Sequence, residues 1–148
     1  MKPCPYSVSQ LLAHDTPMVL IDQVECYDDE NIYSNINVTE NSPFLYGETA
    51  PSYIAVEYMA QTIACYSGIQ ARNSGNEVRI GFLLGTRKLK LYVDEFHVGD
   101  NLLVKARILY NDGEMAAFDC RILKKNKIVA EAKLNVYQPE NPEWFESN

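Results

Sequence analysis

The segment SYIAVEYMAQTIACYSGIQAR, residues 52–72, is the one long helical stretch of this chain, and it decides the fold. From Tyr53 to Ile69 its side chains are apolar around nearly the whole circumference of a helix. The residues that follow, Asn73 to Gly75, are of the types that end helices. A helix that is apolar on every side is typical of a buried helix. We therefore expect a core that covers more than one face of this helix.

Strand patterns and turn residues occupy most of the remaining chain. Ser7–Ala13 is predicted to form a short helix, and Glu40–Pro51 is predicted to form an irregular connection. The predicted strands are Met18–Ile21, Val24–Tyr27, Ile32–Thr39, Val78–Leu84, Leu89–Val93, Leu102–Tyr110, Met115–Leu123 and Ile128–Tyr137. The fourth and fifth of these could be one strand bent at Gly85. Turn residues at Asp28–Asn31 and Asn111–Gly113 indicate antiparallel hairpins.

This order of elements fits one α+β domain over residues 1–148, a length that suits a single core. A curved antiparallel sheet can cover one side of the long helix, but its other side then needs another cover. A second copy of the chain is the simplest cover, so we predict a homodimer or a larger assembly. The segment 139–148, with two prolines and three glutamates, is predicted to be a loose tail.

The composition excludes several classes of protein. The net charge of −7 argues against nucleic-acid binding, which needs a basic face. No apolar run is long enough to cross a bilayer, and residues 1–15 lack the apolar core of a signal peptide, so we expect a cytoplasmic protein without a membrane contact. The cysteines lack metal-binding spacing, and we predict neither metal nor cofactor; they are Cys4, Cys26, Cys65 and Cys120.

Basic residues gather in two places along the sequence. The first group comprises Arg87, Lys88 and Lys90, and the second runs from Arg121 to Lys127. Either group could contact an acidic partner. The second group also fits the solvated tip of a hairpin, which is the simpler interpretation.

Four segments, in the right order, resemble the 3-hydroxyacyl-acyl-carrier-protein dehydratases. Leu11–Val24 resembles the family's opening Leu-Leu-Pro-His segment and first strand, and Pro51–Gln61 resembles the start of its central helix, where a glutamate precedes Met-Ala-Gln. Gly85–Lys88 and Val98–Asp100 resemble its later strand and Pro-Gly-Asp turn. The resemblance implies a hot-dog fold, in which an antiparallel sheet wraps one long central helix. It is strongest to a divergent branch linked with aryl-polyene-type pathways.

The resemblance implies dehydration of a 3-hydroxyacyl thioester held on acyl carrier protein, in fatty acid or polyene/polyketide-type biosynthesis. It also implies that the acidic carrier is a partner, with Arg87, Lys88 and Lys90 as candidate contacts. One departure bears on the mechanism. The family carries its catalytic histidine in a Gly-His-Phe-Pro segment before the helix, whereas Gly47–Pro51 is shorter and has no histidine.

Glu57 is the leading catalytic candidate. It matches the family's helical glutamate and stands on an apolar helix, where burial would favour the neutral form that a proton donor needs. His14 is predicted to act with it in a relocated dyad, although His14 could equally order the turn before the first strand. His97 is expected in an exposed loop.

Substrate contacts are predicted at the start of the long helix. Ser52, Tyr53 and Ile54 would offer free backbone N–H groups and the positive end of the helix dipole to the thioester carbonyl. Gln61, the last residue of the Met-Ala-Gln motif, is the fourth predicted contact.

Two other functions stay open at this level. Hot-dog enzymes also include thioesterases, in which a helical carboxylate activates water and free thiol is released. The missing histidine also fits a non-catalytic subunit that completes the pocket of a related dehydratase in a heteromer. Product analysis separates the first alternative from dehydration, and restoration of activity by a paired subunit would indicate the second.

Overall fold

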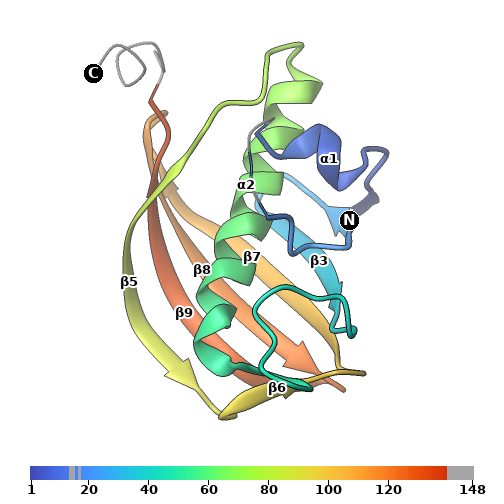
Figure 1. The fold of residues 1–148 in the computed structure, drawn as a ribbon. Coiled ribbons are helices and arrows are strands. Elements are labelled where there is room, and N and C mark those ends of the chain that lie inside the picture. Colours follow the sequence, from blue (N-terminus) through green and yellow to red (C-terminus); the bar gives the residue numbers. More distant parts are fainter. Residues whose placement is uncertain (14–15, 17, 140–148) are drawn as a thin grey trace, which may run out of the picture.

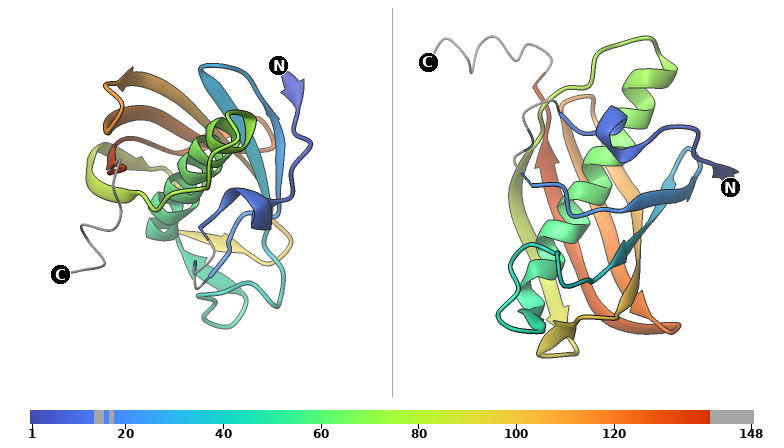
Figure 2. Two further views of the ribbon diagram at one scale, coloured as in Figure 1. Left: turned by 90° about the horizontal axis from the view of Figure 1, so that it is seen from above. Right: turned by 45° about the vertical axis from the view of Figure 1, so that its right-hand side comes forward.

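The computed structural model describes residues 1–13, 16 and 18–139. The long helix α2 (Ala55–Asn73) lies along the concave face of an antiparallel sheet that curves around it (Figures 1 and 2). Within the described residues the sheet order is β1-β2-β3-β7-β8-β9-β5. Its strands are β1 (Lys2–Pro3), β2 (Gln23–Tyr27), β3 (Asn31–Asn37), β5 (Phe82–Leu91), β7 (Asn101–Asn111), β8 (Met115–Lys124) and β9 (Lys127–Tyr137).

Smaller elements close the two ends of the helix. The short helix α1 (Val8–Leu11) packs on the C-terminal half of α2, and the 3₁₀ turn η1 (Ser52–Ile54) leads into its first residue. Strand β4 (Thr49–Pro51) pairs with β6 (Glu95–His97) beside that turn. No helix among the described residues is both long and apolar enough to span a bilayer.

Most sequence-based predictions of the elements are confirmed. The long helix, the short helix and the hairpins are present, and β5 is one strand with irregular pairing near Gly85. The prediction of a strand at Met18–Ile21 is wrong. Leu20 and Ile21 are apolar because they are buried in the core. The Leu20 N–H donates to the side chain of Gln61 and not to a neighbouring strand. β4 and β6 were missed because three residues give no recognisable alternation.

The core lies between α2 and the inward residues of the sheet. Along β3, Ile32, Ser34 and Ile36 are buried, which confirms the predicted alternation. The hydroxyl of Ser34 lies 2.6 Å from that of Thr62 on α2, which in turn donates to the carbonyl of Tyr58 at 2.9 Å. Because both hydroxyls are bonded, they can be fully buried without the cost of an unsatisfied polar group.

One side of α2 is left uncovered by the described residues of its own chain. The outward stripe of the helix exposes Glu57 and Ala64. Strand β5 ends the sheet order beside it, and Leu83 and Leu84 on that strand are 42% and 56% exposed. The sequence-based prediction that a second subunit covers this side stays a prediction.

The predicted loose tail begins with a fixed residue. Pro139 is buried, and its carbonyl accepts a hydrogen bond from Arg79 at 3.0 Å. Gln138 donates to the carbonyl of Arg79 at 2.8 Å, so the end of β9 is tied to the segment that precedes β5. The rest of the predicted tail, 140–148, lies outside the described residues.

Asp100 fixes the turn between β6 and β7. Its carboxylate accepts the His97 N–H at 2.8 Å and lies 2.7 Å from the Lys124 ammonium. Burial raises the pKa of Asp100, but the hydrogen bonds from Lys124 and from the His97 N–H outweigh burial, so the pKa lies below its ordinary value. A carboxyl with a depressed pKa stabilises the fold above its unfolded-state pKa, and this contribution is lost as the pH falls through the folded-state pKa.

We expect Asp100→Asn to lower the free energy of unfolding by about 1–3 kcal/mol at pH 7, because the buried ion pair and one accepting oxygen are lost. The difference from the native chain should begin to shrink as the pH falls below the unfolded-state pKa of about 3.8, and it should vanish once the pH has fallen through the lower pKa of the native carboxylate. Urea denaturation at pH 7 and at pH 3 measures both effects. Asp94→Asn, at an exposed neighbouring position, is the control. An equal loss for the two variants would contradict this role for Asp100.

Candidate functional site

An apolar pocket of about 510 Å³ opens at the N-terminal end of α2. Residues from three segments line it: Thr16, Met18 and Leu20 before β2, Phe44 and Tyr46 in a loop, and several residues between Pro51 and Gln61 at the start of the helix. Glu57, Tyr53, Ile54 and Gln61 all line this pocket. The structure therefore brings together four of the residues predicted from the sequence.

Among the described residues that line the pocket, Glu57 is the acidic one. Its carboxylate accepts a hydrogen bond from the Gln61 amide at 3.2 Å. The expectation that Glu57 is buried is wrong for the single chain, because the sheet covers the opposite face of α2 and leaves this stripe exposed. The carboxylate is thus accessible to a ligand or to a neighbouring subunit.

Gln61 holds Glu57 in place. Its side-chain oxygen accepts the Leu20 N–H at 2.8 Å, and its amide donates to the Met18 carbonyl at 2.7 Å as well as to Glu57. The side chain is buried, and both amide hydrogens are used. These bonds favour a positioning role for Gln61 over the direct substrate contact predicted from the sequence.

The helix start offers fewer free donors than the sequence suggested. The Ser52 N–H donates to the Asp94 carbonyl at 3.0 Å, and Ser52 is buried outside the pocket lining, so it does not supply the expected contact. The Tyr53 N–H has no acceptor among the described residues. Tyr53 lines the pocket at the positive end of the helix, so its N–H is a candidate donor to a ligand oxygen.

Aromatic side chains surround the mouth of the pocket, and sequence reasoning missed two of them. Phe44, Tyr46 and Tyr53 are 51%, 74% and 66% exposed. Phe44 has a φ of 66°, a strained conformation for a bulky residue. The sequence does show two aromatic residues between Pro43 and Gly47. Because this connection has no helix or strand periodicity, their position in the fold could not be predicted.

The two histidines do not complete the site within the described residues. His14, the predicted dyad partner, lies outside them. His97 is exposed, lies 3.4 Å from the Glu95 carboxylate and borders a different hollow with Asp94 and Asp100. This agrees with the sequence-based preference for an exposed His97.

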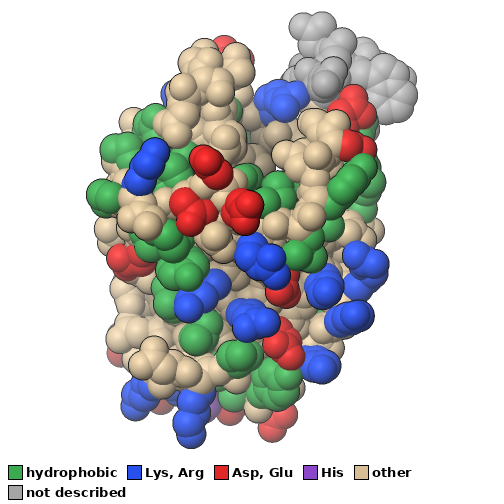
Figure 3. All heavy atoms as spheres, turned by 180° about the vertical axis from the view of Figure 1, so that it is seen from behind, with side chains coloured by type: hydrophobic (Ala, Val, Ile, Leu, Met, Phe, Trp, Pro, Cys, Tyr) green, Lys and Arg blue, Asp and Glu red, His purple; other side chains and the backbone are tan. Residues whose placement is uncertain are grey.

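Arg87, Lys88 and Lys90 lie on β5, away from the pocket. Arg87 pairs in register with Lys133, and Lys90 with Glu131. On β9 these two partners alternate with buried residues, so they point to the sheet face turned away from α2. Arg87 and Lys90 therefore lie on that face as well, where Lys and Arg side chains gather (Figure 3). Lys88 lies in the irregular stretch between them, with a φ of 52°.

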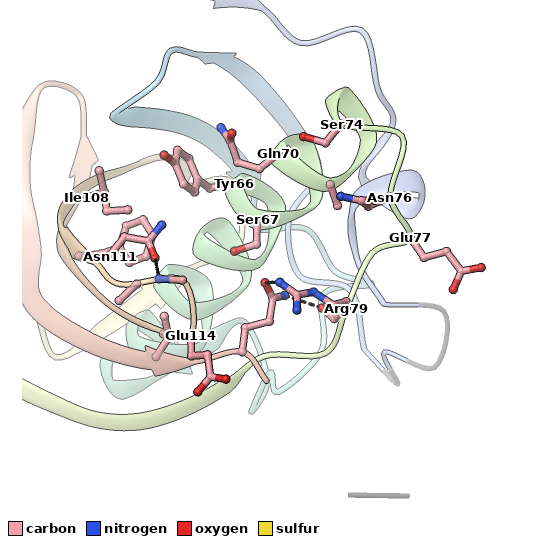
Figure 4. Close-up of a pocket in the computed structure, with 16 residues that line it drawn as sticks. Tyr66, Ser67, Gln70, Ser74, Asn76, Glu77, Arg79, Ile108, Asn111 and Glu114 are labelled. Carbon is pink, nitrogen blue, oxygen red and sulfur yellow. Dashed lines mark hydrogen bonds between the residues drawn. The ribbon is translucent and has the colours of Figure 1, made fainter. Parts of the chain in front are cut away.

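A second pocket, of about 740 Å³, lies at the other end of α2 (Figure 4). Tyr66, Ser67 and Gln70 enter it from the helix, while Arg79 is held by its hydrogen bonds to the end of β9. None of the site residues predicted from the sequence lines this pocket.

Thiol chemistry is disfavoured at the buried cysteines. Burial raises the pKa of Cys65 to about 12 and also raises that of Cys120. Both thiols therefore stay protonated near neutral pH. In the described part of the chain, no cluster of three His, Cys, Asp or Glu side chains could hold a metal ion.

A family model for ApeP-like proteins, described as ApeP dehydratase, matches residues 6–146. The chain belongs to the ApeP-like dehydratase family. It is 28% identical over 133 residues to the 3-hydroxyacyl-[acyl-carrier-protein] dehydratase FabZ of Streptococcus sanguinis, an alignment that covers 86% of this chain and 92% of that enzyme. A FabZ of Anaplasma phagocytophilum is 27% identical, with 86% of this chain and 91% of that enzyme covered.

Solved structures agree with this assignment. The ApeP-like chain superposes on a chain of the dehydratase heterocomplex ApeI:P from Xenorhabdus doucetiae with a TM-score of 0.89 and 29% identity, covering 97% of this chain and 98% of that one. A hypothetical thioesterase from Streptococcus pneumoniae, solved with coenzyme A, gives a TM-score of 0.61 at 15% identity and covers 78% of this chain and 86% of that one. That second likeness shows the fold alone. The predicted hot-dog fold and the predicted dehydratase class are confirmed.

Proposed function

We propose that this ApeP-like protein dehydrates a 3-hydroxyacyl thioester carried on acyl carrier protein, as the glutamate-bearing subunit of a heteromeric dehydratase. The observation that carries the proposal is the placement of Glu57, fixed by Gln61, in an apolar pocket that Tyr53 also lines. Family membership and the FabZ relatives support the reaction class. Fatty acid or polyene-type biosynthesis is the setting in which such a product is used.

The reaction needs three groups around the substrate. A base removes a proton from C2, an acid protonates the hydroxyl that leaves C3 as water, and a donor stabilises negative charge on the thioester oxygen while the C2–C3 double bond forms. Glu57 supplies one acid–base group, and the Tyr53 N–H supplies the donor. The apolar lining, with Phe44 and Tyr46 at its mouth, suits an acyl chain.

A second subunit would complete the site. The described part of the chain leaves the face that bears Glu57 uncovered, β5 forms the adjacent sheet edge, and Gly47–Pro51 lacks the family's histidine. The ApeI:P structure is a dehydratase heterocomplex, which supports a heteromeric arrangement over a homodimer. A related subunit seated on this face would cover Glu57 and contribute the second acid–base group. His14 is the alternative source of that group within this chain.

The proposal is tested by assaying the purified chain alone, and mixed with a histidine-bearing hot-dog dehydratase subunit, on a 3-hydroxyacyl carrier-protein substrate. We expect the enoyl thioester to form in the mixture, with no release of free thiol. Free thiol as the main product would contradict dehydration and indicate a thioesterase. If the chain alone is fully active and His14→Ala abolishes that activity, the second acid–base group is His14 and not a group from a partner subunit.

Carrier docking is expected to involve the exposed middle of β5. Reversing two charges with Arg87→Glu and Lys88→Glu should lower kcat/KM about tenfold or more for a carrier-protein substrate, because the carrier is acidic and steering depends on charge. A small pantetheine thioester should be turned over as before. The matched control is Lys125→Glu with Lys127→Glu at the β8–β9 turn. An equal loss on both substrates would show that the two β5 residues do not contact the carrier.

A further inference from the structure

The second pocket, at the C-terminal end of α2, has a floor of apolar side chains (Figure 4). Ile108, Ala116 and Val136 share the inner face of the sheet with Phe118, which is 2% exposed, yet these three are only half-buried. Tyr66 meets Phe118 edge-on, with 5.5 Å between the ring centroids. The described residues thus leave part of the inner face of the sheet open to the pocket.

The end of the described chain is fixed at the rim of this pocket. The Gln138 N–H donates to the Glu114 carbonyl at 2.8 Å, and the Gln138 side-chain amide donates to the Arg79 carbonyl at 2.8 Å. The Arg79 guanidinium in turn donates to the Pro139 carbonyl at 3.0 Å. Gln138, Glu114 and Arg79 all line the pocket. Residues 140–148, which we call the C-terminal segment, therefore start from the pocket rim.

The C-terminal segment, with the sequence ENPEWFESN, carries two adjacent aromatic residues, Trp144 and Phe145. Trp144 is the only tryptophan of the chain. The match to the family model runs to residue 146, so both aromatic residues lie within the part of the chain that the family model covers. Aromatic side chains contribute more to stability when they bury their large apolar surface than when they stay in water. A half-open apolar pocket at the start of the segment offers that burial.

We propose that the C-terminal segment docks into the second pocket of its own chain, with Trp144 and Phe145 on the apolar floor. Trp144 is five residues beyond Pro139, so an extended chain carries it up to about 17 Å from the rim. Tethering makes the contact intramolecular, so a modest affinity is enough to keep the pocket occupied. The proposal does not rest on the dehydratase reaction, because the second pocket shares no lining residue with the pocket of Glu57.

Charge does not favour this docking. The C-terminal segment carries three glutamates, and the pocket is lined by Glu77 and Glu114 against a single cation, Arg79. The Arg79 guanidinium is already bonded to Pro139 and Gln138. Burial of the aromatic side chains must therefore drive the docking, and added salt, which screens the repulsion between carboxylates, should leave the docked state intact or favour it.

The single tryptophan makes the test direct. Fluorescence of Trp144 is recorded for the full chain and for a synthetic peptide of residues 140–148, with excitation at the red edge of the tryptophan band so that the tyrosines do not contribute. We expect the emission of the full chain to be blue-shifted from that of the peptide. Its quenching by acrylamide should be several-fold weaker, and both differences should persist when sodium chloride is added.

Pocket variants locate the docked segment. Ser67→Arg places a long side chain in the pocket and should shift the emission of Trp144 back toward that of the peptide. Gln70→Arg, at an exposed position on the rim, should act in the same direction with little risk to folding. The matched control is Ser9→Arg, the same replacement at an exposed position of α1 outside the pocket lining, and it should leave the emission unchanged.

A thermal melt gives an independent measurement. Trp144→Ser combined with Phe145→Ser should lower the unfolding midpoint by about 2–6 °C, because the pocket floor becomes exposed again. Glu143→Gln combined with Glu146→Gln changes the same segment without touching the aromatic residues. That control should leave the midpoint unchanged or raise it slightly, because it removes two carboxylates that face an acidic rim.

Four outcomes would overturn the proposal. The first is identical emission and quenching of Trp144 in the full chain and in the peptide. The second is a blue shift that survives both pocket variants, which would place the segment elsewhere on the molecule. The third is a blue shift that grows with protein concentration, which would mean that a second copy of the chain holds the segment. The fourth is release of the segment by salt, which would show that ion pairs hold it.

Discussion

Glu57→Gln is expected to lower kcat/KM for dehydration by about 10²–10⁴-fold in the complex with a paired dehydratase subunit, because glutamine cannot exchange a proton with the substrate. The change preserves shape and leaves the bonding partner Gln61 intact. Since Glu57 is exposed in the single chain, its replacement should leave the thermal unfolding midpoint nearly unchanged. Enoyl-thioester formation and a thermal melt of the same preparation measure the two quantities.

The control for this prediction is Glu77→Gln, at an exposed position that borders the second pocket. It should retain full turnover. If the Glu57→Gln complex also keeps full turnover, Glu57 is not catalytic and the chain serves its partner as a structural subunit. A loss of activity that accompanies a large fall in the melting midpoint would count against a catalytic role as well.

Gly68→Ala should lower the free energy of unfolding by about 2–4 kcal/mol, net of the gain of about 1 kcal/mol from replacing glycine in a helix. An added Cβ would lie 2.1 Å from the carbonyl oxygen of Leu11, and 2.8 Å from its carbonyl carbon and Cα. These are backbone atoms, so no side-chain rotation relieves the clash, and α1 must move away from α2. That movement would disturb the hydrogen bond from Arg72 to the Gln10 carbonyl.

Urea denaturation of the two proteins measures the effect of Gly68→Ala. Gly85→Ala is the matched control, because nothing lies within 4 Å of the Cβ it would add, and it should change the stability little. Equal or higher stability of the Gly68→Ala variant would mean that α1 does not need its close approach to α2.

The helix start shows the limit of sequence reasoning about the site. The family motif from Pro51 to Gln61 lies in the segment that lines the pocket, and four of the five site residues predicted within it, all but Ser52, meet there. The motif does not predict that the Ser52 N–H donates to the Asp94 carbonyl, or that the Gln61 side chain forms hydrogen bonds with the backbone of Met18 and Leu20. Those partners are distant in the sequence. Similarly, the exposure of Glu57 depends on which side of α2 the sheet covers, and residue type alone does not determine this.

By itself, the sequence determined the long helix, the inward alternation of Ile32, Ser34 and Ile36, and the family to which the chain belongs. Apolar periodicity and short motifs are local properties, so they can be read from neighbouring residues. The tertiary structure alone decided that Glu57 and Tyr53 line one pocket with Phe44, and that Arg87 and Lys133 lie opposite each other on neighbouring strands. Those arrangements depend on strand register and helix packing, which bring together residues that no local pattern connects.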